Sequence, residues 1–74
     1  MMSENKRAFV STLETALVLY SREMISKMEY DPHNEAWSGL ETVEIRFAGG
    51  HRKVINVTGD SCIAIMHDIW EALS

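Results

Sequence analysis

Cys62 is the residue of this chain with the strongest intrinsic reactivity. It follows Gly59-Asp60-Ser61 and falls in the first turn of a predicted helix, where the positive helix end can lower a thiol pKa and make the sulfur nucleophilic. Such chemistry needs a base at i+3 or i+4, but His67 lies five residues on and on the polar side of the helix. Because Cys62 falls in the apolar half, we interpret it as a packing residue and predict no enzyme activity.

Three histidines are the other candidates for chemistry. His33, His51 and His67 belong to three separate predicted segments, so a shared metal site would require the fold to gather them. His67 and Glu71 have the i, i+4 spacing of half a metal site, but two ligands are too few. We therefore predict no metal and no cofactor, and interpret this pair as a solvated helix face.

Gly59-Asp60-Ser61 precedes a helix and could offer backbone N–H groups to an anion. The carboxylate of Asp60 would repel an anion at that position, so ordinary capping by Asp60 or Ser61 is the better interpretation. The chain has no glycine-rich phosphate-binding motif.

The residues best suited to a contact surface are aromatic and basic. Tryptophan is enriched where binding energy is concentrated, which directs attention to Trp37 in a polar segment and to Trp70 at the margin of an apolar helix face. For Trp37 a second interpretation stays open, in which the ring folds back to fill the small core. The predicted interaction surface comprises Tyr30, Trp37, Trp70, Arg46, His51, Arg52 and Lys53, together with Val18 and Ile25.

Composition limits the class of protein. Seventy-four residues allow one domain, residues 1–74, and 46% hydrophobic with 24% charged residues is typical of a globular chain. The formal net charge of −4 argues against a general nucleic-acid binder. A single cysteine cannot form an intrachain disulfide, and we see neither a secretory leader nor an apolar run of membrane-spanning length. We expect a cytoplasmic protein with no membrane contact.

The N-terminal part has helical spacing of its apolar residues. The spacing predicts one amphipathic helix over about residues 3–29, capped by Ser3 and ended before Pro32. Val18 and Ile25 form a second, thinner stripe on nearly the opposite side, which a single copy would leave exposed.

The middle of the chain predicts a loop over 30–40 and a β-hairpin with strands at about 41–48 and 51–58. Matching polar and apolar faces requires a three-residue turn, either Ala48-Gly49-Gly50 or Gly49-Gly50-His51. Acidic residues gather over 30–45 and basic ones over 46–53. This separation is explained either by solvated surface charges that are grouped by chance or by complementary contacts between subunits.

A second amphipathic helix is predicted over about 60–73. The resulting fold class is α+β, a small α-β-β-α domain whose antiparallel hairpin carries both helices on one face. A lone hairpin has two open edges, so we predict a homodimer that joins two hairpins into a four-stranded sheet, or alternatively packs through the Val18/Ile25 stripe.

The leading functional hypothesis is a non-catalytic protein–protein interaction module that binds itself and in addition another protein. The alternative is a small regulatory protein that binds nucleic acid through the basic hairpin tip, and the net charge makes this the weaker hypothesis.

Overall fold

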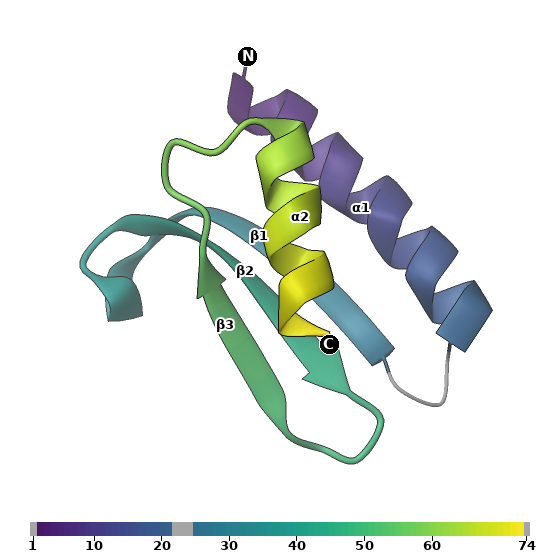
Figure 1. The fold of residues 1–74 in the computed structure, drawn as a ribbon. Coiled ribbons are helices and arrows are strands. Elements are labelled where there is room, and N and C mark those ends of the chain that lie inside the picture. The colour runs from purple at the N-terminus through teal and green to yellow at the C-terminus, as the bar shows by residue number, and fades with distance from the viewer. Residues whose placement is uncertain (1, 22–24, 74) are drawn as a thin grey trace.

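The computed structural model describes residues 2–21 and 25–73, and it is an α+β fold with a three-stranded sheet (Figure 1). The strands are antiparallel in the order β1-β2-β3, and both helices lie on one face of the sheet. Along the chain the elements are α1 (Met2–Ser21), β1 (Ile25–Asn34), the short 3-10 helix η1 (Glu35–Trp37), β2 (Leu40–Phe47), β3 (Arg52–Asn56) and α2 (Cys62–Ala72). Among the described residues, neither helix is both long and apolar enough to cross a membrane.

The predicted first helix was too long, because residues 25–29 belong to strand β1. Residues 22–24, which the prediction also included, lie outside the described residues. A β-bulge explains the misleading spacing: Ile25 pairs with Phe47 and Lys27 with Arg46, so the register shifts at this point. Ile25 and Met28, three residues apart, are therefore both buried, which imitates a helical repeat.

The predicted loop over 30–40 was also wrong, because β1 continues to Asn34. Pro32 lies in this strand, which is an edge strand where a missing N–H breaks no ladder hydrogen bond. The Asn34 side chain accepts from the N–H of Ala36 (3.1 Å) and starts η1. Ser38 and Gly39 then reverse the chain with φ values of 56° and 79°.

The hairpin between β2 and β3 has the predicted three-residue turn, Ala48-Gly49-Gly50. The N–H of Phe47 donates to the carbonyl of His51 (2.9 Å), and the N–H of Gly50 donates to the carbonyl of Phe47 (3.0 Å). Gly50 has a φ of 97°, so the alternative that puts glycine at the left-handed position is confirmed.

The core lies between the sheet and the two helices. Helix α2 begins after Ser61, whose hydroxyl accepts from the N–H of Ala64 (3.2 Å), so Ser61 rather than Asp60 is the cap. The buried apolar side chains come from α1, β1, β2, α2 and the residue after β3: Val10, Ile25, Met28, Tyr30, Val43, Ile45, Val57, Ile65 and Ile69.

Candidate functional site

The predicted interaction residues do not form one surface. Tyr30 is 4% exposed and Ile25 is 1% exposed, so both belong to the core and neither can contact a partner. The predicted helical stripe of Val18 and Ile25 does not form, because Ile25 lies in strand β1 and is buried. The side chain of Val18 lies outside the described part of the chain. Trp37 is 40% exposed and does not join the core.

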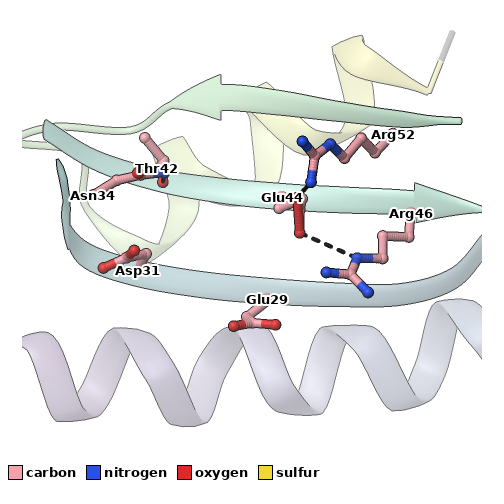
Figure 2. A pocket seen from close by; sticks show the side chains of 7 residues that line it. All are labelled: Glu29, Asp31, Asn34, Thr42, Glu44, Arg46 and Arg52. Carbon is pink, nitrogen blue, oxygen red and sulfur yellow. Dashed lines mark hydrogen bonds and ion pairs between the residues drawn. The ribbon is translucent and has the colours of Figure 1, made fainter. Parts of the chain in front are cut away.

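The cations of the hairpin tip already have partners within the chain. Arg46 and Arg52 both contact the carboxylate of Glu44 at 3.2 Å (Figure 2). Lys53 donates to the carbonyl of Ala72 (3.2 Å) at the negative end of α2. The two contacts with Glu44 join the basic segment 46–53 to the acidic segment 30–45 within one chain.

The face of the sheet opposite the helices is polar. Glu44 lies at its centre, and carboxylates outnumber guanidinium groups around the hollow that Figure 2 shows. The hollow is lined by Glu29, Asp31, Asn34, Thr42, Glu44, Arg46 and Arg52. Lys27, which pairs with Arg46 on the same face, balances the third carboxylate, so this face has no excess of positive charge to attract phosphate.

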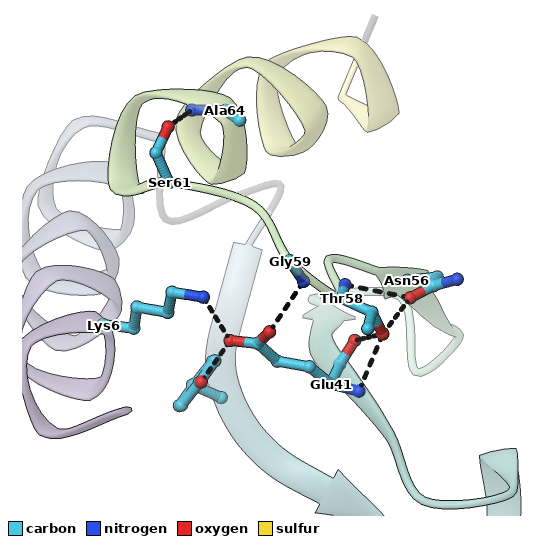
Figure 3. Close-up of polar contacts among 8 residues, drawn as sticks. Lys6, Glu41, Asn56, Thr58, Gly59, Ser61 and Ala64 are labelled. Atoms are coloured by element: carbon cyan, nitrogen blue, oxygen red, sulfur yellow. Dashed lines mark hydrogen bonds and ion pairs between the residues drawn. The ribbon is translucent and has the colours of Figure 1, made fainter. Parts of the chain in front are cut away.

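A buried polar cluster joins α1 to the sheet and to the segment before α2 (Figure 3). Lys6 Nζ lies 2.8 Å from Glu41 Oε2, the hydroxyl of Tyr30 donates to the same oxygen, and the N–H of Gly59 donates to Glu41 Oε1 (3.1 Å). Burial alone would raise the pKa of Glu41, but the donors from Lys6, Tyr30 and Gly59 outweigh it and hold that pKa below its usual value. Burial and the bond to Glu41 raise the pKa of Tyr30.

This cluster was not predicted from the sequence, because Lys6, Tyr30 and Glu41 have no regular spacing and come from three different elements. Its donors all satisfy one carboxylate, and Lys6 is only 7% exposed, so a substrate has no access to the charge pair. We interpret the cluster as a polar clamp that fixes α1 on the sheet.

Two further groups of acidic residues involve α2, one with Asp60 from the segment before the helix and one on its exposed side. The Asp68 carboxyl, burial and nearby negative charge raise the pKa of Asp60, whose Oδ2 is buried without a hydrogen-bond partner. On the exposed side, His67 Nε2 lies 3.5 Å from Glu71 and His67 Nδ1 lies 4.0 Å from Asp68. Asp68 adds a third potential ligand to the predicted pair, because one ligand atom from each of His67, Asp68 and Glu71 lies within 4.8 Å of the others. His67 and Glu71 are exposed and are i, i+4 neighbours on one helix, so we still interpret the group as a solvated helix face.

The exposed apolar surface is concentrated on α2. Ile63 is 75% exposed, Met66 44% and Trp70 66%. At 100° per residue these side chains share one flank, turned about 110° from the core-facing Ile65 and Ile69. We call Ile63, Met66 and Trp70 the α2 flank. The sequence analysis placed Trp70 at the margin of the apolar helix face, and that position was its only signal for this surface.

The two edges of the sheet differ. On β1, the N–H of Met28 donates to the Glu14 carboxylate (2.7 Å), and Arg7 donates to the carbonyl of Tyr30 (3.4 Å). Side chains of α1 therefore cover the β1 edge. On β3, none of the described residues forms a further strand beyond the edge.

No protein-family model matches the chain, and comparisons with curated proteins and with solved structures likewise find no match.

Proposed function

We propose that this protein is a non-catalytic protein–protein interaction module that works as a homodimer in the cytoplasm. The observation that carries the proposal is the α2 flank, where three large apolar side chains stand in solvent on one side of a short helix. Exposed apolar surface of this kind marks contact sites, and tryptophan and methionine are enriched in them.

The polar groups favour a protein-binding function over catalysis and over nucleic-acid binding. Lys6, Tyr30 and Glu41 are used within the polar clamp, and Arg46 and Arg52 are held by Glu44. Nucleic-acid binding through the hairpin tip would require these guanidinium groups to leave a carboxylate for a phosphate. No observation favours that second function.

Site-specific photocross-linking tests the proposal. The photoreactive residue p-benzoylphenylalanine replaces Ile63, and intact cells that produce the protein are irradiated. If the α2 flank is a contact surface, a discrete protein adduct forms at this position, because a bound chain covers the side chain.

The matched control places the same residue at Glu71, on the polar side of the same helix, where we expect little adduct. Equal yields at Ile63 and Glu71 would show random collision and would refute the proposed contact surface. Mass spectrometry identifies whether the adduct contains a second copy or another protein.

A further inference from the structure

The unpaired edge of β3 has hydrogen-bonding groups that point outward in a regular order. The N–H of Val57 donates to the carbonyl of Glu41, and the carbonyl of His51 accepts from Phe47, so the odd-numbered residues of this segment pair with β2. In an antiparallel pair the intervening residues direct their N–H and C=O groups to the other side. Arg52, Val54 and Asn56 therefore present these groups at the edge, and within residues 2–21 and 25–73 no hydrogen bond satisfies them.

One self-pairing register satisfies all of these groups. A two-fold axis through Val54 places Val54 opposite Val54 of the second copy, and Arg52 opposite Asn56 of the second copy. Shifting the axis to Lys53 would put two ammonium groups directly opposite each other, which destabilises a sheet. Shifting it to Ile55 would require the N–H of Thr58, which already donates to Asn56 Oδ1 (3.0 Å).

Side chains along the edge are compatible with this register. Val54 is the apolar member of the polar sheet face, opposite Glu44, and the axis brings two β-branched valines together. The charges that usually protect an edge are held elsewhere, because Arg52 contacts Glu44 and Lys53 reaches the end of α2.

We propose that β3 is the homodimer interface, and that a second copy of this chain adds its own β3 antiparallel, with the two-fold axis at Val54. The inference rests on the proposed homodimer and names its interface. Since each chain has three strands, the joined sheet contains six, in place of the four predicted from a two-stranded hairpin.

The test compares Val54→Pro with Val54→Thr by sedimentation equilibrium. Proline removes the outward N–H of residue 54, which makes no bond to any described residue, whereas threonine keeps both the N–H and the β-branched shape. We expect Val54→Pro to weaken dimerisation about tenfold or more and Val54→Thr to change it by less than about threefold. If the wild type is a dimer and Val54→Pro dimerises as well as the wild type, β3 is not the interface, while the homodimer itself stands.

Hydrogen exchange of the wild type provides a readout that does not depend on a variant folding. The amides of Arg52, Val54 and Asn56 should exchange more slowly at high than at low protein concentration, because only the paired edge protects them. Fast exchange of these amides under conditions where the wild type is dimeric would overturn the inference. A wild type that stays monomeric throughout would refute both the inference and the proposed homodimer.

Discussion

At the scale of single residues, Glu41 is a carboxylate with three hydrogen-bond donors. Lys6, Tyr30 and Gly59 each donate to it, from α1, β1 and the segment before α2. A buried ion pair loses most when one charge is removed, because the other is then left in a poorly solvated site. The stability of the fold should therefore depend on the ionisation of this carboxylate.

We predict that Glu41→Gln lowers the free energy of unfolding at pH 7 by about 2 kcal/mol, because Lys6 keeps a buried charge without its counter-ion. The pKa of Glu41 in the fold lies below its usual value of 4.5, so its contribution is complete above that pH and is lost as the pH falls through the folded pKa. Urea denaturation at pH 7 and pH 3 measures the effect, and the gap between wild type and variant should narrow at pH 3.

The control is Glu29→Gln, which removes a carboxylate that is 56% exposed and 3.6 Å from Lys27. Exposed pairs contribute little, so we expect a change of at most about 0.5 kcal/mol. A Glu41→Gln effect as small as that of Glu29→Gln, or one that is independent of pH, would show that the cluster is not a clamp.

At the scale of elements, the connection between β1 and β2 depends on a glycine. Gly39 has a φ of 79°, and an added Cβ would lie 2.6 Å from the Cε1 atom of His33. Gly50 also has a positive φ, but a Cβ there would meet nothing within 4 Å. A side chain at Gly39 would therefore meet both backbone strain and a steric clash, whereas a side chain at Gly50 would meet backbone strain alone.

We predict that Gly39→Ala destabilises the protein by about 2 kcal/mol and Gly50→Ala by about 1 kcal/mol, since only the first adds a clash to the strain of a left-handed residue. Thermal or urea unfolding of both variants measures the difference. Adding His33→Ala to Gly39→Ala should recover part of the loss. Equal costs at the two glycines would contradict the packing of His33 on Gly39.

The elements differ in how far the sequence determines them. The turn Ala48-Gly49-Gly50 and the cap Ser61 are local features, because alternating faces and a side-chain acceptor specify them within a few residues. Strand β1 is not local in this sense. Its bulge next to Ile25 forms only in the pairing with β2. Without knowledge of that pairing, the spacing of the apolar residues in this segment predicts a helix.

At the scale of the whole molecule, the third strand changes which surfaces need a partner. β1 covers one side of the hairpin, and Glu14 and Arg7 cover the outer edge of β1. The remaining open edge and the α2 flank come from the C-terminal half. The sequence indicated incomplete burial correctly at Trp70, but it placed Tyr30 on the surface because the contact with Glu41 joins residues 11 positions apart in different strands.

A core of this size, without disulfide or metal, supplies only about 3–5 kcal/mol of stability, so a second chain is a direct source of additional burial. The most direct test is the mass of the wild-type protein by sedimentation equilibrium at micromolar to millimolar concentrations. We predict the mass of two chains, with dissociation to one chain only on dilution. A mass of one chain over the whole concentration range would contradict the claim that self-association completes this molecule.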